Sequence, residues 1–134
     1  MTTIIQGNQT GAGSLAPARR VLIITDMLYQ ALNLQRFLAD LGSEATLASE
    51  EDAGLAYLSL TNYDTVIIDV DLGYQVVRDL ATRLRRDHPG SNVAIMVGWW
   101  DARAADMRAY SDLLIYKPVH PQQLREVLGY TRSS

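Results

Sequence analysis

Three charged residues stand at the ends of short apolar runs: Asp26, Asp69 and Lys117. The run before Asp69, Thr65–Ile68, is typical of a strand buried on both faces of a parallel sheet. A carboxylate at the end of such a strand costs desolvation energy unless a charged or hydrogen-bonding partner meets it there. Because sites in open α/β sheets lie at the carboxyl ends of the strands, we expect the three side chains to share one crevice.

The chemistry that suits two carboxylates and one ammonium is phosphoryl transfer to a carboxylate. Asp69 would attack as the nucleophile and become an acyl phosphate. Asp26 would hold a hard divalent cation, since Mg²⁺ is typically bound by one or two carboxylates together with phosphate oxygens and waters. Lys117 would place a compact positive charge on the transferred group. The cation matters because a phosphoryl group brings roughly −1.5 to −2 charges into a site with two carboxylates.

The elements that must position these residues alternate between strands and helices. Five apolar runs predict strands, and five segments with helical spacing predict helices. Gly42 is expected to close the first helix as a C-terminal cap, and Ser49 with Asp52 is expected to begin the second in a capping box. The predicted strands are Val21–Ile24, Glu44–Ala48, Thr65–Ile68, Asn92–Val97 and Leu113–Tyr116, and the predicted helices cover residues 28–41, 49–58, 74–87, 103–110 and 121–128.

Strands that alternate with helices indicate a parallel sheet covered by helices on both sides. The predicted fold class is therefore α/β, a flavodoxin-like (βα)5 doubly wound sheet of five parallel strands. The strand order is taken from known folds of this kind. In that order the first and third strands are neighbours, and we expect the fifth strand to flank the first.

Length and composition exclude several classes of protein. With 134 residues, 48% hydrophobic and 20% charged, the chain is expected to form one soluble globular domain. A net charge of −3 favours neither nucleic acid nor a membrane surface as a partner. The chain lacks cysteine, which excludes disulfides and thiolate chemistry. We find no signal peptide and no apolar run of about 18 residues, and the cytoplasm is the expected location.

Domain boundaries follow from a shift in composition near residue 19. Residues 1–18 contain several Gly, Thr, Gln and Asn and are expected to form a flexible N-terminal tail. The folded domain is expected over residues 19–134. Since no second domain follows Ser134 in this sequence, we expect a stand-alone module.

From about Arg20 to Tyr130 the chain resembles the receiver domain of bacterial response regulators. The motifs that carry the resemblance are V-L-I-I-T-D, V-I-I-D-V-D-L-G and Y-K-P, in this order and at these spacings. The resemblance implies that Asp69 is the phosphoacceptor and that Lys117 contacts the phosphate. It also implies a Mg²⁺ site made by Asp26, Asp69 and the backbone carbonyl of Asp71. In the family the Lys-Pro peptide bond is commonly cis, which a proline permits at modest energy cost.

The function that the resemblance implies is that of a stand-alone receiver in a two-component phosphorelay. Such a domain takes a phosphoryl group from a sensor histidine kinase or a histidine phosphotransfer protein in a Mg²⁺-dependent reaction. It then signals to a downstream protein by protein–protein contact, and it is not an enzyme beyond catalysing its own phosphorylation and dephosphorylation. The face formed by the fourth and fifth helices is the implied interaction surface. A homodimer is compatible with this implied function.

The sequence departs from the family pattern at several positions around the site. Thr25 replaces a second acid, so Mg²⁺ is expected to bind weakly, although the hydroxyl could hydrogen-bond a metal-bound water. Gly98 replaces the usual Ser or Thr, as in an atypical subgroup of receivers, and Leu114 replaces the aromatic switch residue. Two adjacent Trp residues are therefore expected to replace the usual switch. The positions implied to line the site or to act in the switch are Thr25, Gly98, Trp99, Trp100, Leu114 and Pro118.

Other interpretations of these residues stay open. Asp26 could be the N-cap of the first helix, and Asp69 could be a loop acid bonded to backbone amides. Asp71 could be a solvated side chain at the mouth of the site, and Lys117 an ordinary surface residue. The whole chain could be a pseudo-receiver, the same fold acting as a phosphorylation-independent interaction module. A flavodoxin-like cofactor-binding protein is disfavoured because no Gly-rich or Ser/Thr-rich phosphate loop follows the first strand.

Overall fold

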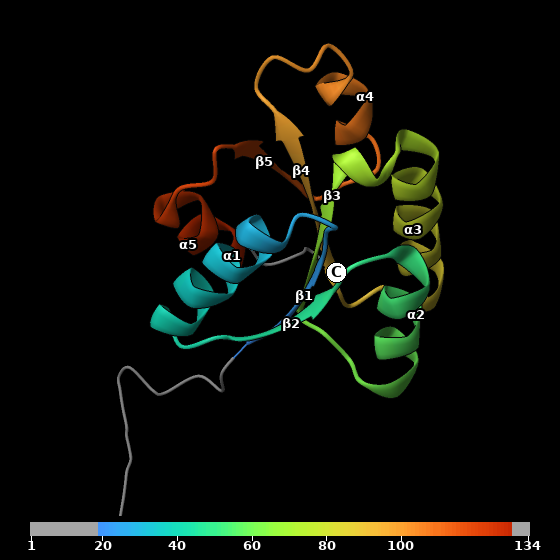
Figure 1. Cartoon of the computed structure of the whole chain (residues 1–134). Helices are drawn as coiled ribbons and strands as arrows, with labels where there is room; N and C mark the ends of the chain where they lie inside the picture. Colours follow the sequence, from blue (N-terminus) through green and yellow to red (C-terminus); the bar gives the residue numbers. More distant parts are fainter. Residues whose placement is uncertain (1–18, 130–134) are drawn as a thin grey trace, which may run out of the picture.

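Five strands form one parallel sheet in the computed structural model, which describes residues 19–129 (Figure 1). The strands follow the order β2-β1-β3-β4-β5. They are β1 (Arg20–Ile24), β2 (Glu44–Ala48), β3 (Thr65–Asp69), β4 (Asn92–Gly98) and β5 (Leu113–Lys117). The helices are α1 (Leu28–Asp40), α2 (Glu51–Leu60), the 3₁₀ helix η1 (Val70–Leu72), α3 (Tyr74–Asp87), α4 (Ala104–Arg108) and α5 (Pro121–Gly129). The flexible tail expected over residues 1–18 lies outside the described residues.

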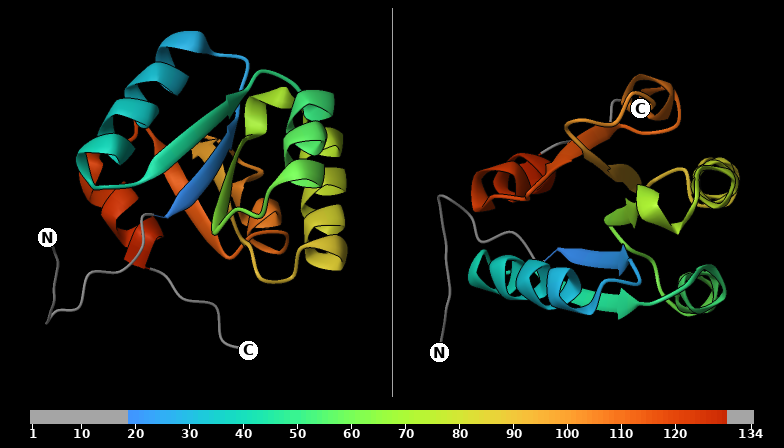
Figure 2. Two further views of the ribbon diagram at one scale, coloured as in Figure 1. Left: turned by 90° about the horizontal axis from the view of Figure 1, so that it is seen from below. Right: turned by 45° about the horizontal axis from the view of Figure 1, so that its top comes forward.

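The sheet is the middle layer of three, with helices on both of its faces (Figure 2). Side chains that alternate along β1 divide the core. Leu22 and Ile24 pack with α2, α3 and α4, whereas Val21 and Ile23 pack with α1 and α5. Every residue of β3 and β4 is buried, as expected for the inner strands of a parallel sheet. The predicted doubly wound α/β fold is confirmed.

The order of the strands corrects one expectation about the site. β1 is flanked by β2 and β3, and β5 pairs with β4 at the edge of the sheet. The expectation that the fifth strand flanks the first is therefore wrong. Both sides of β1 are already occupied when the chain leaves β3, so the later strands can only be added outward through short crossovers. Lys117 consequently starts two strands away from Asp69.

Several helix and strand ends follow the local signals in the sequence. The predicted helix Tyr74–Asp87 has these bounds in the structure. At the end of α1, Gly42 has a φ of 85°, and the amide of Ser43 donates to the carbonyl of Leu38 at 2.9 Å. A left-handed glycine that closes such a bond is a common way to end a helix, and the expected C-terminal cap is confirmed.

The start of α2 differs from the predicted capping box. The N-cap is Glu50, and it makes no side-chain capping bond, so the expected cap by Ser49 is wrong. Glu51 and Asp52 lie in the first turn, where carboxylates interact favourably with the positive end of the helix dipole. The fourth helix is also shorter than the predicted 103–110. No helix within residues 19–129 is long and apolar enough to cross a lipid bilayer.

Candidate functional site

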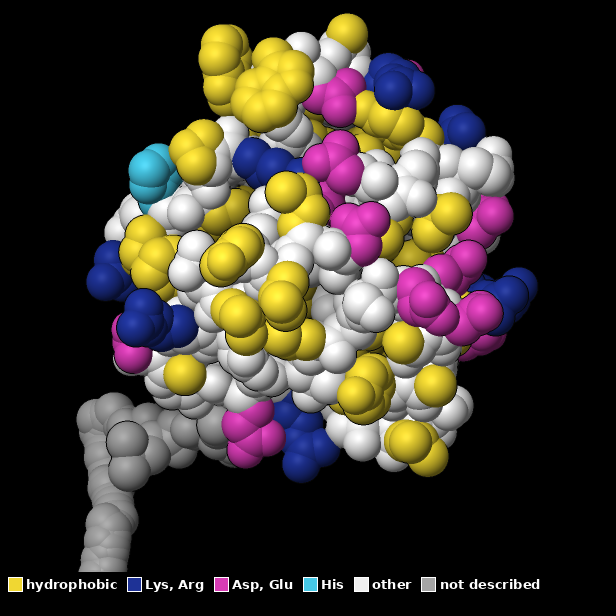
Figure 3. Space-filling model, in the orientation of Figure 1, with side chains coloured by type: hydrophobic (Ala, Val, Ile, Leu, Met, Phe, Trp, Pro, Cys, Tyr) yellow, Lys and Arg dark blue, Asp and Glu magenta, His cyan; other side chains and the backbone are white. Residues whose placement is uncertain are grey.

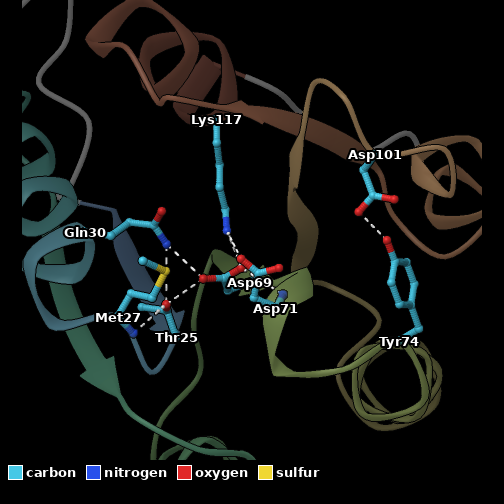
Figure 4. A network of polar contacts seen from close by, with 8 residues as sticks. All are labelled: Thr25, Met27, Gln30, Asp69, Asp71, Tyr74, Asp101 and Lys117. Carbon is cyan, nitrogen blue, oxygen red and sulfur yellow. Dashed lines mark hydrogen bonds and ion pairs between the residues drawn. The ribbon is translucent and has the colours of Figure 1, made fainter.

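Asp69 lies at the carboxyl end of β3, the central strand of the sheet, and it is fully buried (Figure 4). Four donors from the described part of the chain meet its two carboxylate oxygens. A carboxylate has about four lone-pair positions, so these bonds satisfy it. The donors come from the ends of β1 and β5, from α1 and from η1. Their bonds offset the desolvation cost of an acid at the end of a buried strand.

The Oδ1 oxygen of Asp69 accepts from one cation and from the backbone. Lys117 Nζ donates to it at 2.7 Å, and the amide of Asp71 donates at 3.0 Å. The second bond makes Asp69 the N-cap of η1. The short helix ends at Gly73, whose φ of 115° favours glycine. Asp69 does bond to a backbone amide, as its loop-acid interpretation assumed, but it also bonds to three side chains.

The Oδ2 oxygen of Asp69 accepts from two neutral side chains. Thr25, directly after β1, donates through its hydroxyl at 2.7 Å, and Gln30, in the first turn of α1, donates through Nε2 at 2.9 Å. Thr25 is itself buried, and its hydroxyl oxygen accepts from the amide of Met27 at 3.2 Å. Thr25 therefore bonds directly to Asp69, a contact that the sequence did not predict.

The ionisation of the site follows from these contacts. Burial alone would raise the pKa of Asp69, but hydrogen bonds from Lys117, the Asp71 amide and Thr25 outweigh it and hold the pKa below its ordinary value. Burial alone would lower the pKa of Lys117, but its bonds to the two carboxylates raise that pKa above its ordinary value. The two directions agree, so both residues of the pair are charged at neutral pH.

Lys117 reaches Asp69 across the end of β4. In the register of the sheet, Lys117 is paired with Gly98, and Asp69 is paired with Met96. The side chain of Lys117 is only 12% exposed, so its interpretation as an ordinary surface lysine is wrong. Its Nζ also lies 2.7 Å from Oδ2 of Asp71. The carboxylate of Asp71 is 61% exposed, as its interpretation as a solvated side chain expected, and it is also paired with Lys117.

Asp26 is the predicted site residue that the structure leaves apart. It is exposed, and it forms no hydrogen bond or ion pair with another residue in the range 19–129. It is not the N-cap of α1 either, because Met27 occupies that position. The structure thus brings Asp69 and Lys117 together without contact from Asp26. The expectation of a shared crevice is confirmed for Asp69 and Lys117 and stays a prediction for Asp26.

The oxygen atoms around Asp69 are of the kind that Mg²⁺ prefers. The ligands that the resemblance implies are the carboxylates of Asp26 and Asp69 and the backbone carbonyl of Asp71, and all of them are oxygens. Asp26 has no competing partner among the described residues, whereas both oxygens of Asp69 are already engaged. Within residues 19–129 no cluster of three or more Asp, Glu, His or Cys forms a ready metal site. The donor set fits Mg²⁺ in chemical type, and a cation on Asp69 would compete with the donors already there.

Gly98 ends β4 beside the site, and the ring of Trp100 lies over it. A Cβ atom at residue 98 would come within 2.7 Å of that ring, so the indole fills the space that a side chain at this position would enter. Trp99 and Trp100 are 72% and 67% exposed and meet edge to face. Leu114 packs, partly buried, against the core. Hydrophobic side chains stand out at the top of the molecule, where the loop after β4 lies (Figure 3).

A polar tether joins the start of α3 to the loop after β4. The hydroxyl of Tyr74 donates to Asp101, and the guanidinium of Arg103 lies 3.5 Å from the centre of the Tyr74 ring. Burial and the bond to Asp101 raise the pKa of Tyr74, and the same bond lowers the pKa of Asp101. The tether links the segment after Asp69 to the loop that carries the two tryptophans (Figure 4).

Sequence reasoning missed Gln30, the carboxylate of Asp71 and the tether. Gln30 carries a usable signal, because it is a polar residue one turn into a helix that begins directly after the end of β1. The pairing of Asp71 with Lys117 carries none, because the two residues are 46 positions apart. The tether likewise joins residues 27 positions apart.

Known receiver domains share this arrangement of elements. The chemotaxis response regulator CheY4 of Vibrio cholerae is similar with a TM-score of 0.70 and 20% identity, over 84% of this chain and 97% of that chain. A CheY-like receiver domain protein of Methanospirillum hungatei reaches 0.72 and 23%, over 84% and 91% of the two chains. A response regulator of Thermotoga maritima reaches 0.73 and 21%, over 84% and 95%. No family model matches the chain, and no curated protein matches it.

The chain therefore has the fold of response-regulator receiver domains, as the resemblance implied. The peptide bond between Lys117 and Pro118 is cis, as the resemblance also implied. Asp69 lies at the end of β3 and Lys117 at the end of β5, as their positions after apolar runs predicted.

Proposed function

We propose that this chain is a response-regulator receiver that accepts a phosphoryl group on Asp69 and signals by contact with other proteins. The single observation that carries the proposal is the fully buried carboxylate of Asp69 with Lys117 Nζ 2.7 Å from one oxygen. Buried charge pairs with shifted pKa values at the carboxyl ends of strands are typical of functional sites in α/β folds. The receiver fold of the chain supports the same assignment.

In the reaction an oxygen of Asp69 attacks the phosphorus atom of a phosphohistidine on a sensor histidine kinase or a histidine phosphotransfer protein. A bond forms between the carboxylate oxygen and phosphorus. The bond between phosphorus and the histidine nitrogen breaks, and its electron pair leaves with the imidazole. The product is an acyl phosphate on Asp69.

Lys117 and Asp71 act together during this transfer. The ammonium is a compact charge that stabilises the transferred group. When Asp69 becomes an acyl phosphate its carboxylate charge is lost, and the bond from Nζ to Asp71 Oδ2 then helps to keep the ammonium beside the phosphoryl group. Mg²⁺ held by Asp26, Asp69 and the Asp71 carbonyl would supply further positive charge for the phosphoryl oxygens. The donors already on Asp69 favour weak binding of this cation.

The readout of the modified state is proposed to lie in the loop after β4. Trp100 covers Gly98, which is paired with Lys117 in the sheet, so a phosphoryl group beside Lys117 would alter the packing of the indole. The tether between Tyr74 and Asp101 would pass the shift to α3. A downstream protein, or a second copy of the chain, would recognise the change at this surface or at the face of α4 and α5. This role places the chain in the cytoplasm, as a signalling protein rather than an enzyme.

The proposal is tested by incubation with acetyl phosphate and Mg²⁺, followed by intact-mass measurement. We expect a phosphate adduct that requires Mg²⁺ and is absent from Asp69→Asn. Beryllofluoride, an analogue of the phosphoryl group, should change the Trp fluorescence of the wild-type chain but not that of the variant. If there is no adduct and no spectral change, the chain is a phosphorylation-independent interaction module and the proposal is wrong.

A further inference from the structure

The two oxygens of Asp69 have neighbours of different charge. Oδ1 lies 2.7 Å from the ammonium of Lys117 and also accepts from the amide of Asp71. Among the described residues, the donors to Oδ2 are neutral: the hydroxyl of Thr25 at 2.7 Å and Nε2 of Gln30 at 2.9 Å. Both reach Asp69 from the side opposite Asp71 (Figure 4). Because an ammonium repels a second cation, Oδ2 is the oxygen that a divalent cation can approach.

The surroundings of Oδ2 favour a cation in one respect and oppose it in another. Asp26 directly follows Thr25 in the chain, and its exposed carboxylate forms no hydrogen bond or ion pair with another residue in the range 19–129. That carboxylate is free to act as a metal ligand. Oδ2 itself already has two donors on its two lone-pair positions. One of these donors must therefore leave before Oδ2 can bind a metal ion.

Gln30 is the donor that can leave. Thr25 is buried, and its hydroxyl also accepts from the amide of Met27 at 3.2 Å, so this side chain is held in place. Gln30 is only partly buried, and it lies on a groove of ≈ 270 Å³ between α1 and the segment after β5. Its amide therefore has space into which it can turn, and water there can replace the bond to Asp69.

We propose that the side-chain amide of Gln30 occupies the position of the divalent cation on Oδ2 of Asp69, so that Gln30 must turn away before Mg²⁺ binds. The inference rests on the proposed function and adds a competing residue to its metal site. It leaves Oδ1, on the side of Lys117, for the bond to phosphorus. Because each binding event breaks the hydrogen bond from Gln30, the site needs a higher concentration of Mg²⁺ than it would without this amide.

The test is a titration of the full chain with Mg²⁺, followed by isothermal titration calorimetry. Gln30→Met keeps the approximate length of the side chain and removes its donor, so the Kd for Mg²⁺ should fall about three- to tenfold, the equivalent of one hydrogen bond. Gln30→Glu also removes the donor and brings a carboxylate to the same place. Since carboxylates are ligands that Mg²⁺ prefers, the Kd of Gln30→Glu should fall below that of Gln30→Met.

The matched controls are the same two changes at Gln35. This residue lies on the same helix and donates to the carbonyl of Ala45 at 2.9 Å, away from Asp69. Gln35→Met tests the loss of a side-chain amide from α1, and Gln35→Glu tests the added negative charge. Both variants should keep the wild-type Kd in about 0.15 M salt, which screens distant charges. An equal fall in Kd for Gln30→Glu and Gln35→Glu, with no change in Gln30→Met, overturns the inference.

A second measurement uses the wild-type chain and does not depend on the folding of a variant. Mg²⁺ should shift the side-chain amide NMR signals of Gln30 and leave those of Gln35 in place. Unmoved Gln30 signals at saturating Mg²⁺, or a Gln30→Met Kd that is not below the wild-type value, overturn the inference. The proposed function then stands if the wild-type chain still forms the Asp69 adduct. A lower Kd in Gln30→Met without any adduct supports the inference and overturns the proposed function, and a chain that binds no Mg²⁺ overturns the inference.

Discussion

The crevice around Asp69 and the loop after β4 lie next to each other and are built in opposite ways. In the crevice, buried polar groups from four elements are fully paired, and Asp69 has no exposed surface. In the loop, Trp99 and Trp100 are mostly exposed, and the Tyr74–Asp101 bond anchors the segment. The crevice is arranged to hold a reactive group in one position, and the loop is arranged so that a small change can move it.

The free-energy cost of disturbing the two regions differs because the crevice is buried and the loop is exposed. An ion pair in a buried site that loses one partner leaves an uncompensated charge, which costs several kcal/mol. An exposed indole that shifts loses few contacts and stays in water, so the cost is small. The proposed function uses both regions, since the buried site would hold the phosphoryl group and the exposed loop would change shape.

Lys117→Met should have the largest effect, because it leaves the buried Asp69 carboxylate without its counter-charge. We expect a loss of about 3 kcal/mol in the free energy of unfolding, measured by urea denaturation. The matched control is the double variant with Asp69→Asn, in which no charge is left unpaired. The double variant should be more stable than Lys117→Met alone. Equal or lower stability of the double variant would mean that the two charges do not stabilise each other.

The pH dependence of stability should be the next largest effect. The folded-state pKa of Asp69 lies below its ordinary 3.8, so its stabilisation is present above the unfolded-state pKa and is lost as the pH falls through the folded-state pKa. The pKa of Lys117 lies above its ordinary 10.5, so its stabilisation is lost only as the pH rises through that higher value.

Between about pH 6 and about pH 3, wild type should therefore lose more unfolding free energy than Asp69→Asn. Urea titrations at the two pH values measure the difference. Asp40→Asn, which changes an exposed acid at the end of α1, should retain the wild-type dependence. The assignment of the acid-sensitive group to Asp69 fails if Asp69→Asn keeps the full pH dependence.

Gly98→Ala should have the smallest effect on stability and a clear effect on the loop. The new Cβ would come within 2.7 Å of the Trp100 ring, so the ring must move. Because Trp100 is 67% exposed and can shift, the change in unfolding free energy should stay below about 1 kcal/mol. Trp fluorescence should change in Gly98→Ala and not in Gly90→Ala, since a Cβ at Gly90 meets nothing within 4 Å. If the Trp emission is unchanged in both variants, the indole of Trp100 does not lie over Gly98 in solution.

The sequence by itself determined the elements and the two central residues. Short apolar runs with β-branched residues predict β1, β3 and β4, because the pattern of neighbouring side chains indicates a buried strand. Asp69 and Lys117 could be found because each follows an apolar run, and parallel strands bring their carboxyl ends to one edge of the sheet. Gly42 could be assigned as a cap for the same local reason, since a left-handed residue after a helix favours glycine.

The tertiary structure alone decided which side chains form hydrogen bonds and ion pairs with Asp69. The order of the strands placed Lys117 across β4 rather than beside β1, because both neighbours of β1 were already taken. The donors Thr25 and Gln30 and the pairing of Asp71 with Lys117 depend on side-chain directions across distant segments. Local patterns report which face of an element is apolar, and they carry no information on which polar groups of separate elements come within hydrogen-bond distance.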